Sequence, residues 1–495
     1  MSQAALPSSF LPFAALLASE DGELLQLDKP LWLTRAPGRL DVLGTGSEAP
    51  GTASISVPLA RSVYTAIQNR EDRKVRIRVL LPKSWGGSRL WEGKVEDLYT
   101  KKGPPRSMAV LRQTFSDPKD LWMMRVLAVM IGLRRTRQLN TPKVGFDIVI
   151  WSRVPEGIGF GERAAFGVSL GLALKGSTGL AKKRVDGVLV AKAVQIGFKE
   201  VLDEDIPLTD ALTSAVGRAD CVLYIEHGAD LTMQWIPIPQ QCSLAAVDLG
   251  YGELNTPSER AQPAIAAQMA LAHLNDAMKA AGNQEYGSWG QISSVDFEGG
   301  MRDHAPPSQK GRDWIKAFGR RADFKALVPL VDPAKAYRLR ASAEHECRES
   351  DRARQLVSNL NEYGRTMREA YLAESGRCLN GGQRSLMEKC KITHPVADDF
   401  VKRFKDAGRK SGMFGARITL NGGSSVLAAA VHQSARGDLR DLTVDFCSGR
   451  DDCGDGLVVV GSDDGGVLLS WWEGVVHPRD EAEADSPEPA TAAKA

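Results

Sequence analysis

The sequence predicts a mixed α+β fold in which strands and helices alternate. Phe146 to Trp151 is β-branched and aromatic enough for a buried strand, and Pro155 ends it. The small and apolar residues from Ala164 to Leu174 are typical of a helix packed closely against a sheet. The glycine-rich loop between them leaves backbone N–H groups unpaired at the positive end of a helix dipole, which predicts a phosphate site.

The composition is that of a soluble globular protein. The chain has 495 residues and can therefore hold two to four domains. Lys plus Arg (63) nearly balances Asp plus Glu (61), so the net charge predicts neither a nucleic-acid nor a membrane partner. No run reaches the roughly 18 apolar residues of a membrane helix. The N-terminus lacks a basic region and a cleavage site, so we expect a cytoplasmic protein.

The cysteines agree with this expectation. The seven are odd in number and scattered, without a CxxC pair, which favours reduced thiols over a disulfide framework or a zinc site. Cys447 and Cys453 lie close together in an Asp- and Gly-rich loop, and we interpret them as loop thiols rather than as a metal or redox pair.

The first third of the chain is expected to be rich in strands. Residues 1–30 predict a short helix and an acidic turn, and Arg35 to Leu59 predicts strand, glycine-rich turn and strand. Val63 to Leu81 alternates as strands do, and residues 85–102 are expected to be loop-rich. Leu121 to Leu139 predicts an amphipathic helix with a basic end, which suits a helix C-terminus.

The remaining elements follow the same logic. Helices are expected over Ala191 to Val201 and, with Asp210 in its first turn, after Leu208. Residues 221–250 predict two strands joined by a Pro-rich turn, and Glu259 to Ala281 predicts a helix. A polar loop follows, from Gln284 to about Lys310, and then helices over 352–375 and 394–408. The tail from Asp480 is acidic and rich in Pro and Ala, so we expect it to be disordered.

Three short motifs occur in a fixed order. The first is Arg-Ala-Pro-Gly-Arg at residues 35–39, followed by a loop that carries Glu48. The second is Val-Pro-Glu-Gly-Ile-Gly at residues 154–159, and the third is Gly-Ala-Arg-Ile-Thr at residues 415–419, followed by a turn with two glycines. Together they resemble the motifs of the GHMP small-molecule kinases, and within that family those of the L-arabinokinase and galactokinase branches.

The resemblance implies a two-lobed fold with the site between the lobes. The N-terminal lobe would be similar to domain 2 of ribosomal protein S5, and the C-terminal lobe would be an α/β sandwich. We expect an N-terminal extension at residues 1–30, the two lobes at 31–225 and 226–475, and a disordered acidic tail at 476–495.

The resemblance also implies an activity: the ATP-dependent phosphorylation of an arabinose- or galactose-like monosaccharide at its anomeric hydroxyl, with ATP and Mg²⁺ as ligands. Asp210 falls on the catalytic acid/base of the galactokinase branch, and Arg39 would keep it ionised and stabilise charge in the transition state. Glu48, Asp248 and Tyr251 would line the sugar pocket. The nucleotide phosphates would contact Pro155, Gly157, Gly159, Gly161, Arg163, Gly422 and Gly423.

The second motif departs from the family pattern. The family continues with two or three serines, one of which helps to hold Mg²⁺, whereas this chain has Gly161, Glu162 and Arg163. The acid that relatives carry in the following helix falls on Gly167, so no metal ligand is assigned. A pseudokinase that binds sugar or nucleotide therefore stays open beside the active kinase. A dinucleotide-binding oxidoreductase is disfavoured because the final glycine spacing and the ribose-binding acid are missing.

One further cluster predicts structure rather than chemistry. His345, Glu349 and Arg352 keep a spacing that places His and Glu on one helix face. A metal site needs a third ligand, which the pattern does not supply, so we expect a packing and helix-pairing role.

Overall fold

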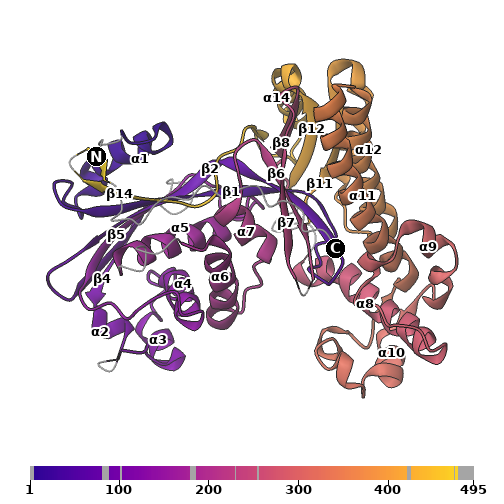
Figure 1. Cartoon of the computed structure of the whole chain (residues 1–495), viewed down its shortest axis with the longest axis horizontal. Helices are drawn as coiled ribbons and strands as arrows, with labels where there is room; N and C mark the ends of the chain where they lie inside the picture. Colours follow the sequence, from indigo (N-terminus) through magenta and orange to yellow (C-terminus); the bar gives the residue numbers. More distant parts are fainter. Residues whose placement is uncertain are drawn as a thin grey trace.

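The computed structural model consists of two β-sheets with helices packed against them (Figure 1). It describes residues 5–80, 88–100, 103–178, 185–228, 230–252, 256–420, 425–472 and 474–477. Within these residues one sheet has nine strands and the other has four, and a two-stranded pair, β9 (Gln309–Lys310) and β10 (Ala336–Tyr337), stands apart. The mixture of strands and helices confirms the predicted α+β class.

The first sheet is built around two long antiparallel strands, β1 (Leu31–Gly44) and β2 (Ala53–Asn69). Their pairing has irregularities between Pro37 and Arg39 and between Asp41 and Leu43. Such irregularities redirect side chains locally. The strand order is β15-β14-β1-β2-β5-β3-β4, with β6 paired to β2 and β7 paired to β6. The bounds are β3 (Lys74–Leu80), β4 (Arg89–Lys94), β5 (Phe146–Ser152), β6 (Cys221–Glu226), β7 (Thr232–Pro237), β14 (Val467–Trp472) and β15 (Val475–His477).

Four helices cover one face of this sheet, and they approach one another closely (Figure 1). They are α4 (Met123–Arg135), α5 (Glu162–Ser177), α6 (Gly187–Leu202) and α7 (Leu208–Val216). A Cβ on Gly167 of α5 would lie 2.5 Å from Val194 of α6, so glycine permits this crossing. On the other face, α1 (Leu11–Leu17) places Phe13 against Tyr64 and Trp151, with ring centroids 5.4 and 6.0 Å away.

The second sheet has the order β11-β12-β8-β13 and is antiparallel throughout. Its strands are β8 (Cys242–Asp248), β11 (Met413–Ile418), β12 (Val426–His432) and β13 (Leu457–Val459). The long helices α11 (Leu339–Thr366) and α12 (Ala370–Ser385) run side by side next to it (Figure 1). The other helices of this half are α8 (Pro257–Ala280), α9 (Ser294–Glu298), α10 (Gly311–Phe318), α13 (Pro395–Ala407) and α14 (Arg436–Cys447).

Several sequence-based expectations for single elements are wrong. Residues 85–102 contain β4 and the short helix α2 (Val95–Leu98) rather than only loop, and α3 (Met108–Thr114) follows. Three strands, not two, lie within 221–250, because β7 pairs with β6 as a hairpin. The helix expected over 352–375 is two helices, since Met367 takes a left-handed conformation (φ 55°) that ends α11.

The chain end returns to the first sheet. β14 pairs with β1 from Leu31↔Trp471 to Arg35↔Val467. Residues near the start and near the end of the described chain therefore lie on adjacent strands. The expected disorder of the tail from Asp480 lies outside the described residues. All seven cysteines are free thiols, as predicted. Among the described helices, none is long and apolar enough to cross a membrane.

Candidate functional site

The three motifs converge on β1. The backbone N–H of Arg39 donates to the carbonyl of Phe160, at 2.8 Å, which joins the first motif to the glycine loop. Asp41 accepts a hydrogen bond from the backbone N–H of Leu420 through Oδ2, at 3.1 Å, which joins the first motif to the end of the third. Both residues lie beside the irregularities in the β1–β2 ladder. Three segments far apart in the sequence therefore meet at one point.

A buried ion pair stands at this junction. Arg39 is 0% exposed and Asp210, in the first turn of α7, is 5% exposed. Nε of Arg39 lies 2.7 Å from Oδ1 of Asp210, and Nη2 donates to Oδ2 at 2.8 Å. This two-point geometry fixes the carboxylate plane. Burial raises the pKa of Asp210 and the charge of Arg39 opposes that rise, which is the balance expected of a carboxylate that can exchange a proton.

Glu48 accepts hydrogen bonds at the N-terminus of α7. Pro207 precedes this helix and provides no side-chain cap. Glu48 instead accepts from Thr209 through Oε1, at 2.8 Å from the backbone N–H and 3.2 Å from the hydroxyl. Burial raises the pKa of Glu48, and these bonds lower it. A carboxylate at a helix N-terminus is favoured by the dipole, so Glu48 and Asp210 lie next to each other at the same helix end.

The glycine loop needs its glycines for two different reasons. Gly157, Gly159 and Gly161 all have positive φ, at 79°, 94° and 68°. A Cβ on Gly161 would lie 2.7 Å from Cγ of Arg39, so this glycine also allows the loop to contact the ion pair. A Cβ on Gly157 would meet nothing within 4 Å, which means that open space lies beside the loop. Pro155 is buried at the start of the loop.

Charged residues surround this loop in a pattern that the sequence did not predict. Nη1 of Arg125, on α4, lies 2.6 Å from Glu156 and 3.7 Å from Glu162. Glu162 is 8% exposed, and its Oε2 is buried without a hydrogen-bond partner. Burial raises the pKa of Glu162 to about 7, although Arg125 lowers it. Arg163 points to Glu204, at 3.2 Å, and its side chain is half exposed.

Two cavities flank Glu48. One, of about 580 Å³, lies between the Glu48 loop and α6, and it also reaches Pro207. The other, of about 400 Å³, lies between the Glu48 loop, α8 and α11, and it reaches Glu346. Both volumes are in the range of about 300–1,000 Å³ that is typical of small-molecule sites. Glu346 is a residue that sequence analysis missed.

The remaining predicted site residues lie in the second half of the chain. Asp248, at the end of β8, accepts from the backbone N–H of Gly250 at 3.0 Å, and burial raises its pKa. The ring of Tyr251 stacks on His394, with centroids 4.0 Å apart. These contacts belong to the second sheet and its helices, not to the Arg39–Asp210 pair. Gly422 and Gly423 lie outside the described residues.

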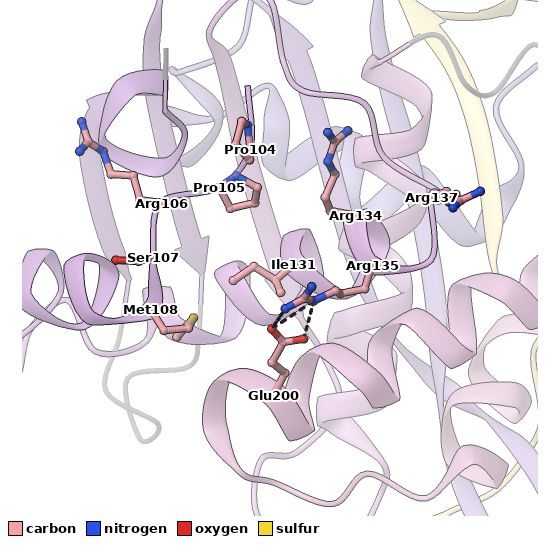
Figure 2. A pocket seen from close by; sticks show the side chains of 10 residues that line it. All are labelled: Pro104, Pro105, Arg106, Ser107, Met108, Ile131, Arg134, Arg135, Arg137 and Glu200. Carbon is pink, nitrogen blue, oxygen red and sulfur yellow. Dashed lines mark hydrogen bonds and ion pairs between the residues drawn. The ribbon is translucent and has the colours of Figure 1, made fainter. Parts of the chain in front are cut away.

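A third cavity, of about 500 Å³, lies at the C-terminal end of α4 and is lined by four arginines (Figure 2). The side chains of Arg106, Arg134 and Arg137 point in different directions, and Arg135 is bound to Glu200 at 2.6 Å (Figure 2). Because the guanidinium groups do not converge, this cavity does not form an anion site.

The cluster on α11 is structural, as predicted. Glu349 is fully buried and paired with Arg417 of β11, and Nη2 of Arg352 lies 2.6 Å from it. Burial raises the pKa of Glu349, but the two arginines outweigh it and lower the pKa to about 2. His345 donates to or accepts from Ser385 at 2.9 Å. No group of three potential metal ligands occurs among the described residues.

Comparison with known proteins shows where this fold occurs. No protein-family model matches the chain. The crystal structure of Lactococcus lactis galactokinase complexed with galactose superposes with a TM-score of 0.68 over 92% of this chain and 99% of that one, at 15% identity. The chain therefore has the two-lobed fold of a GHMP kinase.

The sequence relatives agree. A galactokinase of Chloroflexus aurantiacus is 25% identical over 221 residues, which are 45% of this chain and 50% of that protein. A galactokinase of Roseiflexus sp. is 24% identical over 82% of this chain and 85% of its own length. The L-arabinokinase of Arabidopsis thaliana is 20% identical over 68% of this chain and 36% of its own length. The match thus spans half of the Chloroflexus galactokinase, and the chain is similar in sequence to galactokinases and to an L-arabinokinase.

Proposed function

We propose that the chain is an ATP-dependent sugar kinase that phosphorylates an arabinose- or galactose-like monosaccharide at its anomeric hydroxyl. The observation that carries this proposal is the buried Arg39–Asp210 ion pair at the meeting point of the three motifs. The galactokinase and L-arabinokinase relatives support the reaction class. The free thiols support a reducing, cytoplasmic location for it.

Phosphoryl transfer requires one general base and the neutralisation of negative charge on the phosphates. The acceptor hydroxyl oxygen attacks the γ-phosphorus while its proton passes to the Asp210 carboxylate, and the bond from the γ-phosphorus to the bridging oxygen breaks to release ADP. Arg39 holds the carboxylate in place and offsets negative charge in the transition state. Glu48 holds the acceptor from the side of α7, with Asp248 and Tyr251 assigned to the same acceptor from the second lobe.

The nucleotide phosphates are assigned to the start of α5. The open space at Gly157, the three positive-φ glycines and the N-terminus of this 16-residue helix fit an anion. Arg163 supplies a half-exposed cation, and Gly422 and Gly423 are assigned to the same phosphates. Mg²⁺ would neutralise the phosphates, and Oε2 of Glu162, which has no hydrogen-bond partner, is the group that fits it.

One observation favours a pseudokinase as the second candidate. Arg125, a cation that contacts the glycine loop, is already paired with Glu156 and Glu162. The two carboxylates stand where a triphosphate would approach, and without a bound cation they would repel it. A protein of this kind would keep the fold and bind a sugar while transferring no phosphoryl group.

Calorimetric titration separates the two candidates. The purified chain is titrated with ATP plus Mg²⁺ and then with ATP plus EDTA. A kinase is expected to bind ATP only when Mg²⁺ is present, because the metal offsets the repulsion by Glu156 and Glu162. Arg163→Gln should weaken that binding several-fold, whereas Arg137→Gln, which removes an exposed arginine far from the loop, should leave it unchanged. Binding without metal, or no binding, would refute the kinase and favour the pseudokinase.

A further inference from the structure

The cavity between the Glu48 loop and the second half of the chain has an unusual charge. Glu48 forms one wall, and Glu346, which is 4% exposed on α11, forms another. Among the described residues that line it there is no Lys, Arg or His. The lining consists of Ser47, Glu48, Ala49, Pro50, Ala267, Gln268, Leu271, Gly287, Ser288, Trp289 and Glu346.

Glu346 is held in a fixed position. Its carboxyl receives hydrogen bonds from the backbone of Trp289 and Gly290 and lies beside Ser288. Burial raises its pKa to about 7, and these contacts oppose the rise. The hydroxyl of Ser288 donates to the carbonyl of Pro50 at 2.6 Å. Glu346 is thereby connected to the loop that carries Glu48, so the two acids keep a constant relation across the cavity.

The cationic side chains close to these walls already form ion pairs with other acids. Arg354 donates to the carbonyls of Gly51 and Gly290, at 2.8 and 3.2 Å, and it pairs with Glu226 and Asp351. On the other side of Glu48, Lys199 lines the 580 Å³ cavity but is paired with Asp203 and Asp205 at 2.9 and 3.1 Å. A ligand beside Glu48 therefore meets a net negative environment from both sides.

We infer that Glu48 and Glu346 form an acceptor pocket that selects sugars by charge, taking amino sugars most tightly, neutral sugars next and uronic acids least. An ammonium group would supply a counter-ion to the acids of this cavity, whereas a carboxylate would add further negative charge beside them. The inference rests on the proposed sugar kinase, because it names the class of acceptor for the same site. It makes Glu346 a specificity residue for that acceptor.

D-galactose and two analogues, each of which differs from it in one substituent, test this order. Binding of D-galactosamine, D-galactose and D-galacturonate is measured at pH 7 by calorimetry, each in the presence of ADP and Mg²⁺. We expect D-galactosamine to bind at least about tenfold more tightly than D-galacturonate. The interaction energy of one charge pair at a few ångströms, with an effective dielectric near about 20, is larger than the energy of a tenfold change in affinity. D-galactose should fall between them.

Gln268 offers a matched pair of variants. It is exposed on α8 and lines the cavity, so a change there should not impair folding. Gln268→Lys is expected to lower the affinity ratio of D-galactosamine to D-galacturonate several-fold, and Gln268→Glu is expected to raise it. Glu346→Gln, which retains a hydrogen-bond acceptor, should lower the same ratio.

The outcomes separate the two proposals. Equal or tighter binding of D-galacturonate, or a ratio that Gln268→Lys and Gln268→Glu do not move in opposite directions, would overturn the charge selection while leaving the sugar kinase standing. If none of the three sugars binds although Mg²⁺ and ATP bind together, the sugar acceptor itself is wrong, and the charge selection is overturned with it.

Discussion

At the scale of single residues, the most unusual group is the carboxyl of Glu162. It begins α5 directly after the glycine loop, it is buried, and its Oε2 lacks a hydrogen-bond partner. Buried acids without full pairing are costly and tend to persist at functional positions. In the proposed kinase, Glu162 would complete its pairing with a cation that is brought with the nucleotide.

The free energy of unfolding should reveal this cost. Burial raises the pKa of Glu162 to about 7 from 4.5, so its unfavourable contribution is absent below pH 4.5 and grows as the pH rises to 7. Glu162→Gln is expected to stabilise the protein at pH 8 by about 1–3 kcal/mol, because a tenfold change in proton affinity corresponds to about 1.4 kcal/mol. At pH 4.5 the variant and the wild type should match.

Urea denaturation at the two pH values measures this difference. Glu285→Gln, at an exposed position, is the control and should change stability little at either pH. A Glu162→Gln variant that is less stable than the wild type at pH 8 would show that the carboxylate is well paired, contrary to the account.

How much of the site the sequence could predict depends on the kind of contact. Motif spacing predicts Arg39, Glu48 and Asp210. The structure brings them together at the start of α7. Arg125 and Glu346 carry no such signal. They reach the site only because α4 packs beside α5 and α11 runs beside the Glu48 loop, and such packing is set by tertiary structure rather than by local pattern.

At the scale of elements, the strand, glycine loop and helix from β5 to α5 could be predicted because each has a strong local signal. The hydrophobic run, the proline and the glycines agree with the observed bounds Phe146–Ser152 and Glu162–Ser177. β4 and β7 were missed because both are only partly buried, and strands of that kind show weak alternation. The break at Met367 depends on one left-handed residue, which no composition signal marks.

The glycine loop gives an element-scale prediction. Gly161→Ala introduces a Cβ 2.7 Å from Cγ of Arg39 at a φ of 68°, whereas Gly157→Ala introduces one into open space at a φ of 79°. Both substitutions should cost about 1 kcal/mol for the left-handed backbone, and Gly161→Ala should cost about 1 kcal/mol more. Only Gly161→Ala should also displace the Arg39–Asp210 pair.

Thermal denaturation and ATP titration of the two alanine variants test this difference. Equal stability losses for both, together with unchanged nucleotide binding, would mean that the loop adapts without moving Arg39. The expected pattern would instead show that a change in the glycine loop displaces the Arg39–Asp210 pair.

At the scale of the whole molecule, the site lies where separate parts of the chain are fixed to one another. Arg35 of β1 pairs with Asp463 at 2.7 Å just before the returning strand β14, and Asp41 accepts from Leu420 beyond the end of β11. On the other side, Arg354 of α11 contacts the carbonyl of Gly51 at 2.8 Å. Strand β1 of the first sheet and helix α7 thus supply Arg39 and Asp210, and the second half of the chain contacts the same strand and loop.

The most direct test of this account is the transfer of labelled phosphate from γ-labelled ATP to D-galactose or L-arabinose in the presence of Mg²⁺. The wild type is expected to form a labelled sugar phosphate. Asp210→Asn should reduce the rate by about 10²–10⁴-fold, which is the usual contribution of a general base to the reaction rate. Asp438→Asn, which changes an exposed aspartate in the first turn of α14, should have no effect. A wild-type protein that binds ATP with Mg²⁺ but labels no sugar, or an Asp210→Asn variant as active as the wild type, would contradict the account.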